Sequence, residues 1–228
     1  RRRMQRVVTR LNQRLERPIE PFKLMRRPDM IVRLVHDPKV MEAVVAEAAE
    51  TGDPETVVFQ RARAYAREIV PAFNAYIYFR VGYWLSKTFA RMIYRVRLGY
   101  TDSTALAAIN PKSTVVFVMN HRSNMDYILV SFLAAEKVAL SYAVGEWARI
   151  WPIQGLIRAM GAYFVRRDSG DPLYRMVLQR YVQMATEGGV PQAMYPEGGL
   201  TTDGPAARTQ AGPAGLHAQE LRRAPGRG

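Results

Sequence analysis

The chain has 228 residues, no cysteine, three histidines and a formal net charge of +13 at pH 7. This length is enough for a full hydrophobic core, and a hydrophobic content of 48% excludes a disordered chain. The missing cysteines exclude a disulfide framework, a cysteine-ligated metal and thiol chemistry. Because no two histidines lie close in the sequence, we expect no metal site. No apolar run reaches about 18 residues without a charge, so the sequence predicts no membrane-spanning helix.

Residues 1–29 are predicted to form a basic arm and a connector interrupted by prolines. Residues 1–33 contain 11 Arg or Lys and only 3 acidic residues, so this part of the chain needs an anionic partner or a solvated surface. An anionic membrane and a nucleic acid are the candidate partners. We expect the membrane and no nucleic acid, because the sequence has no helix-turn-helix, RNP or zinc pattern.

Residues 30–100 are predicted to form a helical domain. Asp37-Pro38 and Asp53-Pro54 should each start a helix, because an acidic N-cap followed by proline suits the first turn. An aromatic-rich helix is expected over Phe73–Tyr94. Its rings either belong to the core of this domain or lie among lipid headgroups, in which case three basic side chains would extend to the membrane surface. These are Arg80, Lys87 and Arg91.

The pattern changes to α/β over residues 101–202. Short apolar runs predict three buried strands, at 113–119, 162–165 and 192–195. Helices are predicted at 126–136, 147–160 and 171–187. The alternation of strands and helices indicates an α/β fold with a parallel sheet, after an amino-terminal helical domain. A polar cluster follows each predicted strand, and in such sheets functional sites gather beyond the carboxyl ends of the strands.

The first polar cluster contains His121 and Asp126. In one helix they would lie about 140° apart, so they can meet only if His121 lies in the strand-to-helix turn and Asp126 in the first helical turn. An aspartate that accepts the proton of one imidazole nitrogen leaves the other nitrogen as a general base. Alternatively, His121 is a loop residue beside a helix-capping aspartate.

The second and third clusters suit the binding of an anionic ligand. The guanidinium group of an arginine such as Arg166 or Arg167 can donate two parallel hydrogen bonds to two oxygens of one phosphate. Adjacent residues that leave a strand point in opposite directions, so only one of the two arginines is expected to face the site. The turn Glu197-Gly198-Gly199 lets the backbone come close to a ligand. Alternatively, the two arginines are an exposed basic pair without a ligand, and the Glu-Gly-Gly segment is an ordinary turn at the end of a strand.

Three ordered blocks resemble the glycerolipid acyltransferases, and most closely the glycerol-3-phosphate acyltransferase branch. The resemblance covers residues 111–202 and extends more loosely to about residue 37. The blocks are H-R-S-N-M-D-Y at 121–127, which contains an H-x4-D motif, G-A-Y-F-V-R-R at 161–167 and Y-P-E-G-G-L-T at 195–201. The resemblance implies the α/β fold of this family, with flanking helices and with its sheet incomplete in this chain.

The resemblance also implies a reaction. A fatty acyl group would pass from acyl-CoA or acyl-carrier protein to the 1-hydroxyl of sn-glycerol 3-phosphate, the first step of phospholipid synthesis, at the cytoplasmic face of the cell membrane. His121 would be the general base, oriented by Asp126, with no cofactor and no covalent acyl-enzyme. Ser123 would be a hydroxyl of the turn, because no second histidine or acid flanks it as in a triad. The implied substrate-binding residues are Arg122, Ser123, Arg166, Arg167, Glu197, Gly198, Gly199 and Thr201.

Two departures from the family pattern leave alternatives open. Thr202 stands where the third block usually has arginine, and no fourth block follows. Of residues 204–228, 18 of 25 are Ala, Gly, Pro or Arg, so we expect residues 203–228 to be a disordered tail that results from a frameshift near Gly204-Pro205. If the frameshift is an error of one base, the true protein continues into a fourth block as an active acyltransferase. If it is real, or there is none, the chain is an inactive truncated membrane-surface remnant. A further alternative is the same chemistry on dihydroxyacetone phosphate or on a lysophospholipid; the extended first block and the arginine pair argue against the lysophospholipid.

Overall fold

The computed structural model describes residues 9, 12, 13, 15, 19–93, 108–110, 113–120, 126, 129–130, 138–145, 149, 153–166 and 169–195. Its helices are α2 (Pro21–Leu24), α3 (Arg27–Val35), α4 (Pro38–Thr51), α5 (Glu55–Ile69), the π-helical η1 (Ile77–Gly82), α6 (Tyr83–Ile93), α9 (Ile153–Ala159) and α10 (Pro172–Glu187). Its strands are β1 (Val116–Val118), β2 (Ser141–Val144), β3 (Ala162–Phe164) and β4 (Gln192–Met194). This mixture of helices and parallel strands confirms the predicted α/β class.

The four described strands form one parallel sheet in the order β1-β4-β2-β3. Three of them lie where apolar runs predicted strands, but the sequence analysis missed β2. Its sequence, Ser-Tyr-Ala-Val, mixes two strand formers, Tyr142 and Val144, with serine and alanine, so it shows no continuous β-branched run. Tyr142 pairs with Ala162 on one side and with Ala193 on the other. Pairing on both sides makes this segment a strand.

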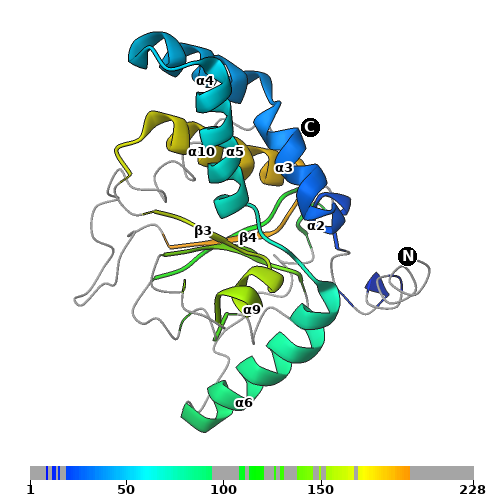
Figure 1. Ribbon diagram of the computed structural model, residues 1–228. Helices are drawn as coiled ribbons and strands as arrows, with labels where there is room; N and C mark the ends of the chain where they lie inside the picture. The colour runs from blue at the N-terminus through cyan, green and yellow to red at the C-terminus, as the bar shows by residue number, and fades with distance from the viewer. Residues whose placement is uncertain are drawn as a thin grey trace.

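Helices cover both faces of the sheet (Figure 1). One face carries α3, α4, α5 and α10, and α9 lies against the other. The alternation of side chains along β3 divides the core accordingly: Tyr163 and Val165 pack with the four helices, whereas Ala162 and Phe164 pack into a cluster that includes Ile157 of α9. The helical segment and one face of the sheet therefore share a hydrophobic core.

Local signals start the helices on the first face. The Asp37 side chain accepts a hydrogen bond from the backbone N–H of Lys39 at 3.1 Å, and α4 ends at Gly52, whose φ is 76°. Both features agree with the sequence. The predicted cap at Asp53 is wrong, since Pro54 is the N-cap of α5. Pro21 and Pro28, which were expected in a connector, instead stand in the first turns of α2 and α3, where a missing N–H costs nothing.

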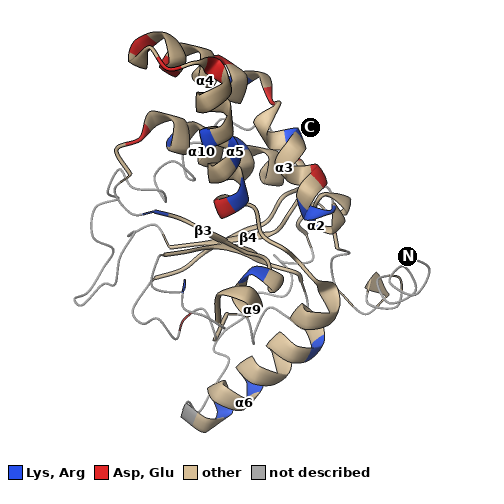
Figure 2. Cartoon of the chain, in the orientation of Figure 1, with Lys and Arg blue, Asp and Glu red and all other residues tan. Residues whose placement is uncertain are grey.

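The aromatic segment forms one helix through η1 and α6, and its rings are divided between core and surface. Small residues and Tyr78 face the protein, whereas five large apolar side chains are exposed. The exposed ones are Tyr76, Val81, Trp84, Phe89 and Met92. This helix extends away from the sheet (Figure 1), and Figure 2 shows basic but no acidic residues along it. None of the helices in the described part of the chain combines the length and the hydrophobicity of a transmembrane segment.

Candidate functional site

Two of the predicted site residues are described, and one of them, Arg166, lies at the carboxyl edge of the sheet. Arg166 follows β3 by two residues, and Asp126 has helical backbone and is half-buried. The other predicted site residues lie outside the described residues, so their convergence stays a prediction. These are His121, Arg122, Ser123, Arg167, Glu197, Gly198, Gly199 and Thr201.

The strand order fixes where each block leaves the sheet. All four described strands are parallel, so their carboxyl ends lie at one edge. The strand before His121 is β1, its neighbour β4 precedes Glu197, and β3, which precedes Arg166, lies at the other end of the sheet. Since neighbouring strands are about 4.8 Å apart, the ends of β1 and β3 are separated by roughly 14 Å.

The Arg166 side chain makes a two-pronged ion pair with Glu68 of α5. Its Nε donates to Glu68 Oε1 at 2.9 Å and its Nη2 donates to Oε2 at 2.7 Å. The guanidinium also lies over the rings of Tyr65 and Tyr174, about 5 Å from each centroid. The hydrogen bond to Glu68 raises the pKa of Arg166. Arg166 is therefore cationic and held on several sides.

Two further arginines surround the same glutamate. Arg149 donates to Glu68 Oε1, and Arg158 Nη2 donates to the Glu68 carbonyl oxygen at 3.1 Å. Burial by itself raises the pKa of Glu68, but the hydrogen bonds from Arg166 and Arg149 outweigh burial and hold that pKa below its usual value. Three guanidinium groups contact Glu68, two at its carboxylate and one at its backbone carbonyl, so the cluster has an excess of positive charge, which attracts an anion.

Sequence reasoning missed Glu68, Arg149 and Arg158. Glu68 lies in the last turn of α5, 98 residues before Arg166. No local pattern marks an acid in the last turn of a helix as the partner of a distant arginine. The contact between α5 and β3 brings the two together.

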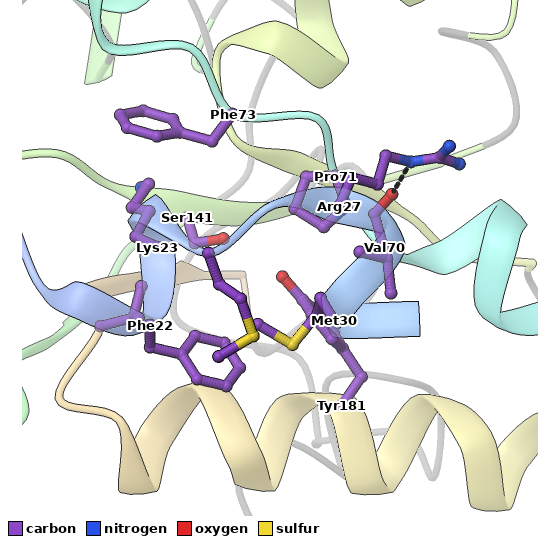
Figure 3. Close-up of a pocket in the computed structure, with 11 residues that line it drawn as sticks. Phe22, Lys23, Arg27, Met30, Val70, Pro71, Phe73, Ser141 and Tyr181 are labelled. Atoms are coloured by element: carbon purple, nitrogen blue, oxygen red, sulfur yellow. Dashed lines mark hydrogen bonds between the residues drawn. The ribbon is translucent and has the colours of Figure 1, made fainter. Parts of the chain in front are cut away.

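A second polar feature lies at the opposite edge of the sheet. Lys23 lines a cavity of about 30 Å³ beside Phe22, Met30 and Tyr181, with room for about two water molecules. Figure 3 shows its side chain extending towards Phe73, whose ring centroid lies 4.7 Å from Nζ. The ammonium donates to the carbonyl oxygens of Ala139, at 2.8 Å, and Leu140. Lys23 therefore ties α2 to the chain entering β2.

We expect Lys23 to make stability rise with pH. Burial lowers the pKa of Lys23 well below its usual value, so the unfolded chain holds this proton more readily than the folded chain. The free energy of unfolding therefore increases as the pH rises from the lowered pKa towards the lysine value of about 10.4. In urea unfolding at pH 7 to 10, the native chain should gain stability relative to Lys23→Met. The exposed Lys39→Met is the control, and a difference between native and Lys23→Met that stays constant across this pH range would contradict the expectation.

Comparison with known proteins gives a family match over the α/β part of the chain. The model of the family described as Acyltransferase matches residues 101–220. A "Glycerol-3-phosphate acyltransferase" of Xylella fastidiosa (strain M23) is 28% identical over 99% of this chain and 26% of its own length. The protein of that name from Xanthomonas axonopodis pv. citri (strain 306) is 29% identical over 89% of this chain and 23% of its own length. That of Pseudomonas entomophila (strain L48) is 31% identical over 78% of this chain and 22% of its own length. The chain spans about a quarter of the length of the curated relatives it matches.

Proposed function

Since the chain belongs to the acyltransferase family, as its three blocks predicted, we propose that the protein acylates the 1-hydroxyl of sn-glycerol 3-phosphate. The acyl donor would be a thioester of CoA or acyl-carrier protein, and the reaction would be the first step of phospholipid synthesis. One observation supports this most: the strands that precede His121, Arg166 and Glu197 belong to a single parallel sheet, so their carboxyl ends lie at the same edge. The names of the relatives supply the acceptor.

The proposed mechanism is direct transfer by His121 and Asp126. The imidazole of His121 takes the proton of the acceptor hydroxyl as the oxygen attacks the thioester carbonyl carbon. The carbon–sulfur bond then breaks, and the thiolate leaves with the proton that the imidazolium returns. Asp126 holds the imidazole orientation and stabilises its positive charge. No protein nucleophile is needed, in agreement with a chain without cysteine.

The proposed acceptor spans the edge of the sheet. Glycerol 3-phosphate has its reacting hydroxyl and its phosphate at opposite ends. The base after β1 would act on the hydroxyl, and Arg166 after β3 would bind the phosphate. The excess of guanidinium groups around Glu68 favours a phosphate at this end.

The test is an acceptor comparison with the full product of the gene. Palmitoyl-CoA or palmitoyl-acyl-carrier protein is supplied with glycerol 3-phosphate, dihydroxyacetone phosphate or a lysophospholipid, and the acylated products are identified by mass spectrometry. We expect the highest kcat/KM for glycerol 3-phosphate. A higher value for either other acceptor would overturn the acceptor assignment. A folded protein that acylates none of them would be the inactive remnant, which the substitution at Thr202 favours.

We further propose that the exposed face of η1 and α6 contacts an anionic membrane at its cytoplasmic side. Trp84 is 63% exposed and Met92 is 70% exposed, and residues 77–93 contain three basic and no acidic residues. Apolar rings beside cations suit the boundary between acyl chains and anionic headgroups. The basic arm would add to the same attraction.

Replacing Trp84 is expected to weaken membrane binding. Burying a large apolar side chain contributes about 1.5–3 kcal/mol, so Trp84→Ser should reduce co-sedimentation with phosphatidylglycerol vesicles by roughly tenfold or more. Val57→Ser is the matched control, because Val57 is 52% exposed but lies on α5. Equal losses in both variants would exclude this face as the membrane contact, and equal binding to neutral vesicles would contradict its preference for anionic lipid.

A further inference from the structure

A single carboxylate joins the ends of two neighbouring strands at the phosphate side of the proposed site. Arg166 follows β3 and Arg149 follows β2, and both donate to Glu68. Glu68 is only 16% exposed, whereas Arg166 is 35% exposed. The glutamate therefore lies behind the arginine, and the arginine is the group that solvent and ligands reach.

The orientation of the Arg166 guanidinium is determined by its surroundings. Glu68 binds the edge formed by Nε and Nη2, and two tyrosine rings flank the group. Both tyrosines are themselves fixed, since Tyr65 Oη donates to Asp171 Oδ2 at 2.5 Å and Tyr174 Oη accepts from the Arg166 backbone N–H at 3.0 Å. The described residues accept hydrogen bonds from Nε and Nη2 of this guanidinium. The edge that carries Nη1 therefore remains for a ligand.

We propose that Glu68 is a positioning residue, which fixes Arg166 so that the Nη1 edge of its guanidinium binds the phosphate of the acceptor. This inference rests on the proposed function and adds to it a residue of the helical segment, outside the three sequence blocks. Glu68 does not touch the reacting atoms. It acts through Arg166, and through the spacing of Arg166 from Arg149.

Glu68 could instead compete with the phosphate for the guanidinium, and the contacts argue against that. A guanidinium has five N–H donors, of which Glu68 takes two, so three remain for a phosphate. The charge of the cluster stays positive with Glu68 in place, because Arg149, Arg158 and Arg166 all contact this residue. Without the carboxylate, the guanidinium groups repel one another, and Arg166 must be ordered anew each time a ligand binds.

The test is the kinetics of Glu68→Gln in the full product of the gene. We expect KM for glycerol 3-phosphate to rise about tenfold, because a misplaced binding group can cost up to about 10² in rate or affinity. KM for the acyl donor and kcat at saturating acceptor should change less than about threefold. Glu68→Asp keeps the charge, and we expect it to restore most of the affinity for the acceptor. Melting temperatures are measured for each variant.

A matched control separates positioning from general stability. Asp37 on α4 forms a similar ion pair with Arg180 of α10, with Nε and Oδ2 2.7 Å apart, away from the carboxyl edge. We expect Asp37→Asn to lower the melting temperature but to leave KM for glycerol 3-phosphate unchanged. If Glu68→Gln does not fold, the kinetics of Arg166→Lys are measured instead. This variant keeps a charge without the planar group that Glu68 holds, so KM for glycerol 3-phosphate should rise while KM for the acyl donor does not. An unchanged KM for glycerol 3-phosphate would contradict the inference.

The possible outcomes distinguish this inference from the function on which it rests. If the native protein acylates glycerol 3-phosphate but Glu68→Gln leaves KM unchanged or lowers it, the positioning role is wrong and the function stands. If the native protein does not acylate glycerol 3-phosphate, the function itself fails. A rise in KM for both substrates, with an equal rise in Asp37→Asn, would show a structural effect only.

Discussion

Replacing His121 by alanine is expected to lower kcat for acyl transfer by about 10²–10⁴, the usual contribution of a general base. Without the imidazole, nothing in the first block takes the proton from the acceptor hydroxyl at neutral pH. Binding of both substrates does not depend on that proton transfer, so their KM values should change little. The measurement is thiol release from palmitoyl-CoA in the presence of glycerol 3-phosphate, with the full product of the gene.

Two variants control this result. His36 is exposed at the end of α3, where its Nδ1 lies 2.8 Å from the carbonyl oxygen of Val32, and His36→Ala should keep native kcat. Asp126→Asn removes the carboxylate that orients His121 and should lower kcat with little change in KM. If His121→Ala retains more than about a tenth of native kcat, a general base is not at work there, and the proposed mechanism is wrong.

The second large effect is on stability: we expect Leu34→Ala to lower the free energy of unfolding by about 2–5 kcal/mol. Leu34 is completely buried on α3, in the cluster that joins the helical segment to α10 and β3. Its truncation removes apolar contacts and leaves a cavity that the surrounding helices close only in part. Urea unfolding followed by circular dichroism measures the change.

The same helix provides the control. Val32 is 51% exposed, so Val32→Ala should change the free energy of unfolding by less than about 0.5 kcal/mol. Similar losses for the two variants would mean that α3 does not pack as described. A decrease of less than about 1 kcal/mol in the free energy of unfolding of Leu34→Ala would also mean that α3 does not pack as described.

The sequence predicted those elements whose signals are local. An N-cap followed by proline at Asp37-Pro38 starts α4, because the carboxylate binds a backbone N–H two residues away. The runs that contain β1, β3 and β4 are mostly apolar, and β3 and β4 are buried as predicted, whereas β1 is only partly buried, with Val118 64% exposed. The three blocks indicated the family, which the family match confirms. Each of these signals is carried by residues close together in the chain.

The carboxyl-edge site was predictable only in part. The blocks pointed to Arg166 and to the pair His121 and Asp126, whose roles stay predictions. They could not point to Glu68, since an ion pair between residues 98 positions apart leaves no mark on either local sequence. The choice between core and surface for the aromatic helix was equally open. Periodicity shows that a helix has faces, but only its packing decides which face is covered, as the contrast between buried Tyr78 and exposed Trp84 shows.

The sequence by itself thus determined where helices begin, which apolar runs become strands and to which family the chain belongs. The tertiary structure decided that Ser141–Val144 is a central strand, in what order the strands lie, and which carboxylate holds Arg166. Capping and strand propensity act within a few residues. Strand order, burial and ion pairing instead depend on which distant segments come together, and the shared core between the helices and the sheet sets that arrangement.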